Sequence, residues 1–587
     1  MISTFRDLAP YLRKHRLRLA IGVALVVLNG YLSTFAPLIP GRVIDGLREG
    51  VLGRPDLLRQ IGLLLLVTLT AAASMTMVRR LILGASWEAQ FDIRHDIFEH
   101  FTRLDGKYYD NTRVGDLMAR LTADLNAVRM LIGVAVMQGL NTALLLGFTL
   151  YRMFSLSTTL TLLTLSVVPF ITVSFSVLLH IIHKRYQKVQ EQFSDISAMA
   201  QENFSGIRVV KGFGIEERET ARFKALNDEF VRRNLALTRV DGPLFPLTEF
   251  LFGLTVSLLL LVGGRLVLGL GSELTIGQFS SFVFLFEGIQ WPLIAVGWIG
   301  NIVQRGTTSW QRLREILDAK PQVTDSELTD YSLTSIRGRI ELSDVTVMFD
   351  GVKALDRVSL VIEPGERVGL TGRTGSGKTL IARLIARMDD PDAGQVLIDG
   401  IDVRRYPIEV VRRYVAVVPQ EPFLFSDTIA ENIAYGVPEA PREELMPRVR
   451  RAAELAQLAG DVEGFPEGYD TRLGERGVTL SGGQRQRTAI ARAIMKDAPV
   501  MIFDDALSAV DTQTEAAILE GLEEVYAGRT TLIVAHRVSA LKQCDRIYVL
   551  EAGRIVEQGT HEELVAQGGW YAEIDRRQQL EEDLEAA

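Results

Sequence analysis

Residues 372–379 carry the strongest chemical signal in the chain, because they read GRTGSGKT and match G-x-x-x-x-G-K-[ST], the phosphate-binding loop. The glycines let the backbone curl until its N–H groups converge on phosphate oxygens. Lys378 places a positive charge on the β- and γ-phosphates, and Thr379 offers its hydroxyl to Mg²⁺. The predicted nucleotide ligands in this loop are Gly372, Arg373, Thr374, Gly375, Ser376, Gly377, Lys378 and Thr379.

The segments on either side of the loop support this interpretation. Residues 367–371 predict a short apolar strand, and residues 380–388 predict a helix. The phosphates would therefore lie at a helix N-terminus, where free backbone N–H groups favour an anion.

Further positions have the order and residue types that one ATP site requires. Phe349 lies upstream of the loop and is expected to stack on adenine, the alternative being an ordinary surface aromatic. Gln420 follows a predicted strand and is expected to reach Mg²⁺ and the attacking water. The apolar run 500–504 ends in Asp504, which is suited to holding Mg²⁺ through water, and Asp505 follows it.

A second surface suited to phosphate lies in the run LSGGQ at residues 480–484, before a helical stretch. One ATP does not need two such surfaces from one chain, so the economical explanation is a head-to-tail pair of domains that each supply one surface to each ATP. The candidates at this end of the chain are Ser481, Gly482, Gly483, Gln484, Asp511 of the run SAVD, and His536 after the predicted strand 531–534.

The composition indicates two unlike halves. The chain has 587 residues, of which 47% are hydrophobic, and it is too long for one ordinary domain. Its mean hydropathy of +0.16 is high for a soluble enzyme and low for a protein that lies wholly in a membrane. A net charge of −8 gives no reason to expect nucleic acid as a partner. The single cysteine, Cys544, excludes an intrachain disulfide framework and a cysteine-based zinc site, and we expect it to be buried and inert.

The N-terminal half predicts an all-helical membrane domain. Residues 1–18 are basic and resemble an interfacial helix on the cytoplasmic side, and the domain that follows covers residues 19–312. Six apolar spans are expected at 19–41, 60–78, 130–151, 158–182, 246–264 and 277–303. Because six spans return the chain to its starting side, a cytoplasmic N-terminus would make the long polar helical segments 79–129 and 183–245 cytoplasmic too. Their tips are expected at 108–115 and 212–217, where Gly, Asp and Asn interrupt the helical pattern.

Two carboxylates fall within the predicted spans. Glu249 lies near the start of the fifth, and Glu287 lies near the middle of the sixth. A carboxylate at mid-bilayer costs about 2.5–3.5 kcal/mol on insertion scales, so each is expected to face a cavity or a partner. Contact with cationic or polar cargo is one interpretation. An interhelical hydrogen bond, or a protonated acid that lines the pore, is the alternative.

The hydropathy pattern changes after residue 312. Residues 313–337 form a mostly polar linker, and residues 338–579 alternate short β-branched runs with amphipathic helices, which is typical of an α/β domain. A short tail at 580–587 completes the chain.

Taken together, these motifs resemble the ATP-binding cassette (ABC) exporters, and the resemblance covers essentially the whole chain. The phosphate loop, Gln420, LSGGQ, the FDD strand end, SAVD and His536 match that family in order and spacing. Six spans before one cassette resemble a half-transporter of the type IV exporter fold. The resemblance implies ATP and Mg²⁺ as cofactors, location in the cytoplasmic (inner) membrane with the cassette in the cytoplasm, and two chains that exchange helices. It also implies that the cytoplasmic tips become coupling helices that press on the cassettes.

One position departs from the family pattern. After the Mg²⁺-holding aspartate the family usually carries a glutamate, the general base that orients water toward the γ-phosphate, whereas this chain has Asp505. Aspartate is one methylene shorter, so its carboxylate would sit about 1.5 Å back, and errors of about 1 Å can cost about 100-fold in rate. The alternative is that aspartate works after a small adjustment. In heterodimeric multidrug exporters, which the chain resembles, one chain carries such a substitution and its partner keeps glutamate.

We therefore expect half of a heterodimeric ATP-driven exporter. This chain's loop and Asp505 would form a slow site, and its intact LSGGQ would complete the competent site of the partner. A homodimeric exporter or lipid flippase with slow ATPase remains open, as does a regulatory or channel-like module that binds ATP without pumping. An importer is disfavoured, because importers usually keep membrane and cassette parts on separate chains. Multidrug, peptide and lipid cargo all remain open.

Overall fold

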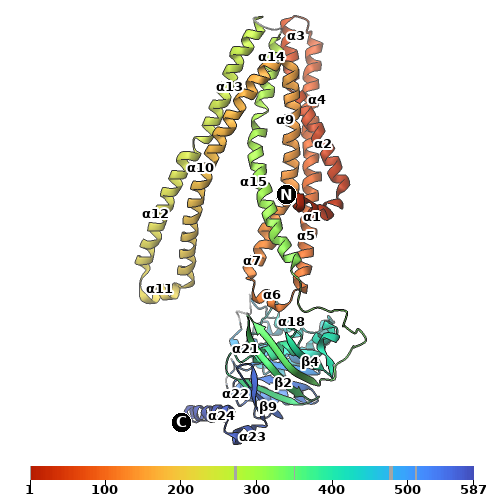
Figure 1. Cartoon of the computed structure of the whole chain (residues 1–587), viewed down its shortest axis with the longest axis vertical. Helices are drawn as coiled ribbons and strands as arrows, with labels where there is room; N and C mark the ends of the chain where they lie inside the picture. Colours follow the sequence, from red (N-terminus) through yellow and green to blue (C-terminus); the bar gives the residue numbers. More distant parts are fainter. Residues whose placement is uncertain are drawn as a thin grey trace. The chain divides into compact units, whose positions relative to one another are not determined.

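The computed structural model describes residues 2–269, 274–349, 351–474, 480–508, 510 and 512–586. The chain divides into two compact units (Figure 1). The first comprises residues 1–99 and 115–318 and is helical throughout its described part. The second comprises residues 100–114 and 319–587 and combines strands with helices. A helical domain followed by an α/β domain is the fold class that the sequence predicts.

The first unit is built from long helices. Up to residue 103 these are α1 (Ile2–Arg13), α2 (Arg16–Phe35), α3 (Leu38–Arg48), α4 (Arg54–Val78), the π-helical η1 (Arg79–Leu83) and α5 (Gly84–Arg103). From residue 114 to residue 205 come α7 (Val114–Ala119), η2 (Arg120–Asp124), α8 (Leu125–Met130), η3 (Leu131–Ala135), α9 (Val136–Leu156) and α10 (Thr158–Ser205). The last are α11 (Ile207–Phe213), α12 (Glu216–Asp241), α13 (Leu244–Val267), α14 (Ile276–Glu287) and α15 (Gln290–Asp318).

Five helices within the described residues are long and apolar enough to cross a membrane: 16–48, 54–103, 114–156, 249–267 and 276–318. A shorter apolar stretch, Thr158–Val167, lies at the start of α10, where the sequence predicts the fourth span. The sequence predicts a sixth span at 277–303, with Pro292 as a candidate for a kink in its helix. In the structure α14 ends at Glu287 and α15 begins at Gln290, so Glu287 lies at a helix end. Gly288 and Pro292 supply the physical reason, because glycine and proline interrupt helical hydrogen bonding.

Helices α3 and α14 approach each other through glycines. A Cβ on Gly277 would lie 1.9 Å from the backbone oxygen of Gly41, so only glycine fits at this crossing. Asp45 then binds the start of α14, because its carboxylate accepts from the Thr275 hydroxyl at 2.6 Å and from the Gly277 N–H at 2.7 Å. Packing and capping together fix the position of α14 against α3.

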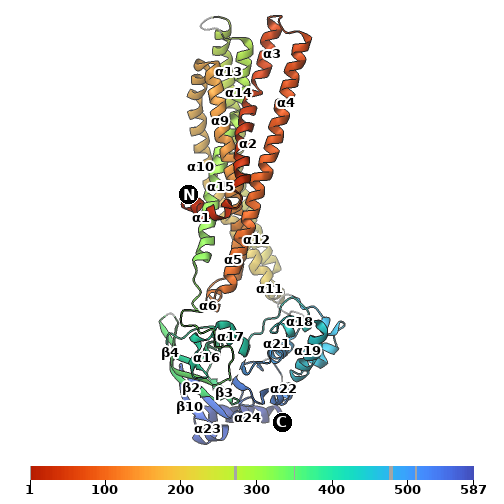
Figure 2. The same cartoon turned by 90° about the vertical axis from the view of Figure 1, so that its right-hand side faces the viewer.

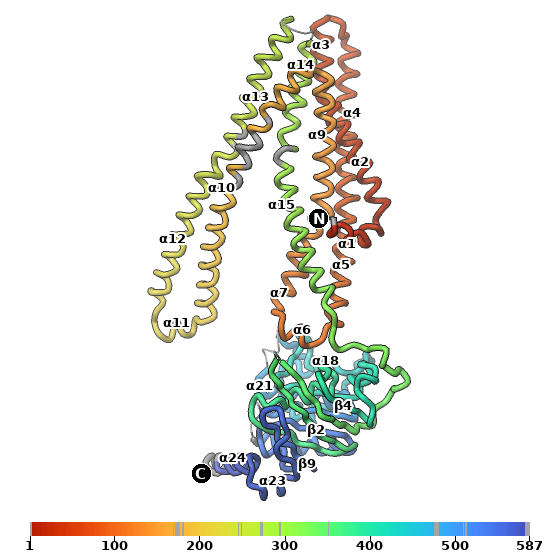
Figure 3. The backbone as a smooth tube through the Cα atoms, in the orientation of Figure 1, coloured from red at the N-terminus to blue at the C-terminus, as the bar shows by residue number. Residues whose placement is uncertain are grey.

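The second long polar segment forms a helical hairpin. Helices α10 and α12 run side by side and α11 joins them, as the tube in Figure 3 shows. The chain turns at Gly214, whose φ of +62° lies in the left-handed region that glycine adopts without strain. The turn therefore lies within the tip that the sequence predicts.

The second unit contains two sheets. One is antiparallel and has the order β2-β1-β4-β5, and the other has the order β10-β9-β3-β8-β7-β6. The strands are β1 (Ile340–Phe349), β2 (Val352–Ile362), β3 (Arg367–Gly372), β4 (Ala393–Ile398), β5 (Ile401–Asp402), β6 (Val415–Val418), β7 (Val500–Asp504), β8 (Thr530–Val534), β9 (Arg546–Glu551) and β10 (Arg554–Gly559).

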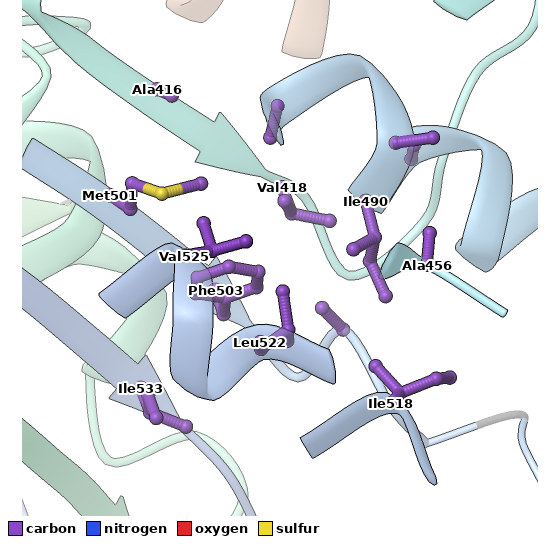
Figure 4. Packing of buried hydrophobic residues seen from close by; sticks show 14 of the residues in the cluster. Ala416, Val418, Ala456, Ile490, Met501, Phe503, Ile518, Leu522, Val525 and Ile533 are labelled. Atoms are coloured by element: carbon purple, nitrogen blue, oxygen red, sulfur yellow. The ribbon is translucent and has the colours of Figure 1, made fainter. Parts of the chain in front are cut away.

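The central strands of the larger sheet run parallel, from β9 through β3, β8 and β7 to β6. Every residue of β7 and β8 is buried, which explains why these strands read as unbroken apolar runs rather than as alternating patterns. Figure 4 shows Phe503 of β7 beside Leu522 and Val525 of α22 (Thr512–Tyr526), within the larger hydrophobic core.

The helices of the second unit include α6 (Gly106–Asp110), α16 (Lys378–Ile385), η4 (Val403–Arg405), α17 (Ile408–Tyr414), α18 (Ile429–Ala434), α19 (Arg442–Leu455), α20 (Ala459–Glu463), η5 (Gly468–Asp470) and α21 (Gly482–Lys496). The chain ends with α22, α23 (His561–Gln567) and α24 (Trp570–Ala586). Helix α16 packs on β3, β7 and β8, whereas α21 packs on α18, α19 and β6. Figure 2 draws α16 and α21 in different parts of this unit.

Candidate nucleotide-binding site

The candidate residues gather because four neighbouring parallel strands end at one edge. The order β3-β8-β7-β6 places the phosphate loop after β3, His536 two residues after β8, Asp504 at the end of β7 and Gln420 two residues after β6. Ligands of open α/β sheets bind at the carboxyl ends of their strands. The topology alone therefore brings together side chains that lie far apart in sequence.

The phosphate loop needs its glycines for steric reasons. Gly372 has a φ of +145°, and a Cβ there would lie 2.0 Å from the backbone oxygen of Leu550. Gly377 has a φ of +104°, and its Cβ would lie 2.6 Å from the Leu355 side chain. The helix after the loop begins at Lys378 and ends at Ile385, whereas the sequence predicts 380–388. The early start places Lys378 in the first helical turn, where backbone N–H groups remain free for an anion.

Lys378 is held inside the curled loop. Its ammonium donates to the backbone oxygens of Gly372 at 2.9 Å and Arg373 at 3.1 Å, and the side chain is buried. Burial lowers the pKa of Lys378, while the nearby carboxylates of Asp505 and Asp504 act in the opposite direction. A partly desolvated cation flanked by backbone N–H groups is suited to binding phosphate.

Thr379 and Asp504 form the part of the site that suits Mg²⁺. The Thr379 hydroxyl donates to the Asp504 carboxylate at 3.3 Å, and burial raises the pKa of Asp504. Hydroxyl and carboxylate oxygens are the donors that Mg²⁺ prefers, and it usually shares them with substrate phosphates. Within the described residues no cluster of three or more His, Cys, Asp or Glu could hold a metal ion alone. The buried Ser376 hydroxyl has no protein partner in the described part of the chain, so the loop retains a donor for phosphate.

Asp505 has a strained backbone and a defined neighbour. Its φ is +48°, a region in which aspartate is enriched among non-glycine residues, and its N–H donates to the Val534 oxygen at 2.8 Å. The Gln420 side-chain amide donates to its carboxylate at 3.3 Å. The Ser508 hydroxyl donates to its backbone oxygen at 2.9 Å. Asp505 thus contacts Gln420 in the segment after β6, Val534 at the end of β8 and Ser508 in the segment after β7.

His536 lies half-buried in the loop that follows β8. Burial lowers the pKa of His536, and the positive charge of Lys378 lowers it further, although Asp505 and Asp504 oppose this. The imidazole therefore favours the neutral form, in which one ring nitrogen donates and the other accepts.

The LSGGQ run begins a helix, as the sequence predicts. Ser481 is the N-cap of α21, and its hydroxyl and the Gln484 side chain form a reciprocal capping box. Gln484 also donates to Asp461 at 2.9 Å, so its amide is fixed within the helical part of the unit. Within the described residues, no hydrogen bond or ion pair joins residues 480–484 to the phosphate loop.

One contact of α21 was not predicted from the sequence. The buried Gln486 donates to the Ser508 hydroxyl at 3.1 Å, and Ser508 in turn donates to the Asp505 backbone. A signal was present, because a polar residue on the apolar face of the helix after LSGGQ needs a partner when buried. These bonds connect the LSGGQ helix to Asp505 within one chain.

The remaining candidates lie further from these contacts. Phe349 is the last residue of β1 and its side chain is 42% exposed. It pairs with Val352 of β2, and Leu355 of the same strand lies against Gly377 of the phosphate loop. Asp511 lies outside the described residues. Glu249 on α13 and Glu287 on α14 belong to the helical unit, and both side chains are exposed.

Residues 100–114 belong to the second unit and contact the helix after the phosphate loop. Asp110 accepts from Arg383 of α16 at 3.2 Å, and Arg383 also pairs with Asp389 at 2.5 Å. The Asp105 carboxylate accepts from the Gln322 N–H at 2.5 Å. The sequence predicts a tip near here but not these partners. The Asp110–Arg383 pair gives the tip a direct connection to the helix that starts at Lys378.

The fold and the site define a membrane-associated nucleotide-binding protein, with apolar helices in one unit and a phosphate-loop ATPase domain in the other. Residues 19–293 match the family model described as "ABC transporter transmembrane region", and residues 355–508 match the one described as "ABC transporter". The chain belongs to the ABC exporters.

Individual relatives agree with this assignment. The multidrug resistance-like ATP-binding protein MdlA of Escherichia coli is 36% identical, over 99% of this chain and 98% of the relative. An ATP-dependent lipid A-core flippase of Aromatoleum aromaticum is 36% identical, over 84% of this chain and 80% of the relative. The solved structure of a bacterial Atm1-family ABC exporter with ATP bound superposes with a TM-score of 0.78 at 27% identity, covering 97% of this chain and 98% of that one.

Membership confirms several expectations from the sequence. The chain is an exporter half-transporter that crosses the inner membrane several times and carries its ATP-binding cassette on the cytoplasmic side. The cassette implies ATP binding, with Mg²⁺ as its usual partner, and ABC exporters work as dimers in a lipid bilayer.

Proposed function

We propose that this chain is one half of a heterodimeric exporter, and that its own phosphate loop belongs to the slow site. The observation that carries this proposal is Asp505, which follows Asp504 where the family usually has glutamate. Its backbone is tied to Val534 and its carboxylate to Gln420, so the short side chain has little freedom to reach further. The LSGGQ residues are intact, and they complete the competent site of the partner.

Each residue of the slow site has a defined task. Lys378 and the free N–H groups of the loop bind the β- and γ-phosphates. Thr379 and Asp504 hold Mg²⁺, with Gln420 beside them, and the ion when bound neutralises charge on the phosphates. Asp505 orients water weakly because of its length, and His536 contacts the γ-phosphate from the next strand. Phe349 stacks on adenine.

The cargo of the exporter is lipophilic or amphipathic. One relative is named multidrug resistance-like and another a lipid A-core flippase, and both descriptions fit molecules that partition into a bilayer. The exposed carboxylates of Glu249 and Glu287 are the groups proposed to contact the cationic or polar part of such cargo.

The unequal hydrolysis proposed for the two ATP sites is tested by a matched pair of variants. These are Asp505→Asn in this chain and Glu→Gln at the equivalent position of its partner. In the reconstituted dimer the partner's change abolishes most ATP turnover and Asp505→Asn removes little, whereas equal losses contradict the proposal.

A homodimeric flippase is the second candidate, and the lipid A-core flippase relatives favour it. The chain is expressed and purified alone to test this. A stable dimer of two copies that hydrolyses ATP and moves lipid favours the homodimer. An inactive or unstable single-chain product, together with uphill ATP-dependent uptake into inside-out vesicles when the partner is present, favours the heterodimer and excludes a module that does not pump.

A further inference from the structure

The C-terminal helix reaches the loop that carries His536. The side-chain amide of Gln578 on α24 donates to the His536 backbone oxygen at 3.0 Å and accepts from the Val538 N–H at 2.8 Å. The orientation of the amide follows from chemistry, because a carbonyl can only accept and an N–H can only donate. The Gln578 side chain thus binds the backbone C=O before Arg537 and the backbone N–H after it, as a neighbouring β-strand would.

Helix α24 is itself held in place, so Gln578 comes from a fixed support. The Glu557 carboxylate accepts from the backbone N–H groups of Trp570 at 2.6 Å and Tyr571 at 3.2 Å, which caps the helix start. Tyr571 is fully buried and its hydroxyl lies 2.9 Å from Nδ1 of His561. Tyr571, Asp575 and Gln578 are spaced four and three residues apart, so they share the helix face that meets the domain.

Packing alone does not fix the His536 side of this loop. Val538 is buried in the core, but Asp505, His536 and Arg537 line a cavity of about 110 Å³ whose other wall includes Leu519 and Tyr526. A cavity provides no atoms to resist a shift of the side chains that line it. Polar contacts must therefore set the position of His536. The Gln578 amide makes such a contact, because it binds the backbone oxygen of His536 itself.

A second polar contact holds the far end of the loop. Glu515 of α22 is buried, accepts from the Ser539 hydroxyl at 2.8 Å and pairs with Arg537. Arg537 also donates to the Val510 backbone oxygen at 3.4 Å. Glu515 thus fixes residues 537 and 539 from one side, and Gln578 fixes residues 536 and 538 from the other.

We propose that Gln578 is a positioning residue for His536, so that the C-terminal helix sets the rate of ATP hydrolysis at this chain's site without contributing to ATP binding. The proposal rests on the role proposed above for His536 at the γ-phosphate. Releasing the amide frees the backbone beside His536, and displacements of about 1 Å in a reacting site cost about 100-fold in rate.

Two variants of Gln578 and one neighbour test the proposal in the full dimer. Gln578→Leu removes both hydrogen bonds. Gln578→Glu keeps the shape and the bond from the Val538 N–H but places an oxygen against the His536 carbonyl. Gln579→Leu is the matched control, because the Gln579 amide donates to Asp575 of its own helix at 2.8 Å. A photo-cross-linkable ATP analogue, 8-azido-ATP labelled at the α-phosphate, tags the chain that binds it, and its conversion to ADP is followed in a single turnover.

We expect both Gln578 variants to cross-link ATP as well as the unaltered chain and to convert it about 10- to 100-fold more slowly, with the control unchanged within about twofold. His536→Ala is combined with Gln578→Leu to separate positioning from a structural defect. If Gln578 acts through His536, adding Gln578→Leu to His536→Ala changes the rate by less than about twofold. The same loss in both backgrounds, or full activity of Gln578→Leu where His536→Ala is slow, overturns this proposal alone. Full activity of His536→Ala overturns the role of His536 and this proposal together.

Discussion

Asp505→Glu tests the central chemical argument, because it restores the missing methylene at the position of the base. The Asp505 carboxylate accepts from the Gln420 amide at 3.3 Å, and its backbone is tied to Val534 at 2.8 Å, so the backbone has little room to adjust. The longer side chain advances the carboxylate by about 1.5 Å toward the phosphate side of the loop, and positional errors of about 1 Å cost about 100-fold.

The expected gain is therefore about 100-fold in hydrolysis at this chain's site, or about 2.7 kcal/mol of transition-state stabilisation. A cost accompanies this gain. Asp505 has a φ of +48°, and the left-handed region costs residues other than glycine about 1–2 kcal/mol, which a short polar side chain such as aspartate partly offsets. We expect the glutamate variant to be less stable than the parent by up to about 1 kcal/mol.

The assay measures conversion of cross-linked 8-azido-ATP to ADP on this chain alone, in a single turnover, so that the partner's site does not contribute. Asp505→Asn serves as the control, since it keeps the length and removes the base, and it should be no faster than the parent. If Asp505→Glu converts its nucleotide at the parent's rate while binding as much of it, the length of the side chain does not limit the site. The assignment of a slow site to this chain would then be wrong.

Three further results follow from the geometry of the cassette. In a denaturant titration, Gly372→Ala should lower the unfolding free energy by more than about 3 kcal/mol, because its Cβ would lie 2.0 Å from the Leu550 backbone oxygen. Gly375→Ala should lower it by about 1 kcal/mol, because Gly375 has a φ of +79° but open space around it. Burial lowers the pKa of His536 below 6.5, so the unfolded chain takes up the proton more readily, and cassette stability should fall as pH drops from about 6.5 through the lower folded pKa. Thermal unfolding from pH 8 to 5 should show a weaker decline in His536→Gln. Burial raises the pKa of Cys544 to about 12, so maleimide at pH 7.5 should label it only after denaturation, and labelling of the native protein, read by mass spectrometry, would contradict this burial.

The phosphate loop was readable from the sequence because its residues are contiguous and their types are set by sterics. Gly372 and Gly377 have backbone angles that favour glycine, and Lys378 must follow them. The sequence pattern predicts the start of α16 two residues too late, since Lys378 and Thr379 are polar and do not extend the apolar pattern that marks a helix. The backbone break at Gly377, rather than hydrophobicity, sets that boundary.

The contacts that connect the site to the rest of the cassette could not be predicted from the sequence in the same way. Gln578 lies 42 residues from His536, and Arg383 lies 273 residues from Asp110. Neither pairing leaves a periodic signal in the sequence, because each depends on where a helix docks on the folded domain. The break between Glu287 and Gln290 has a local signal, because Pro292 predicts a kink in the sixth span, but apolar residues continue on both sides and hydropathy alone does not place it.

The slow base proposed for this chain would be compatible with a working exporter because of where Asp505 is connected. The bond from Ser508 is made to the backbone oxygen of Asp505, and Gln486 of the LSGGQ helix donates to Ser508. Neither hydrogen bond involves the Asp505 carboxylate, so neither depends on the length of this side chain. In the proposed arrangement, the shorter side chain would reduce the reach of the base and leave intact the hydrogen bonds that run from Asp505 to the helix beginning at LSGGQ. On this proposal hydrolysis and communication between the two sites are separable, and for that reason Asp505→Glu should change the rate at this chain's site without weakening the contribution of Ser481–Gln484 to the other.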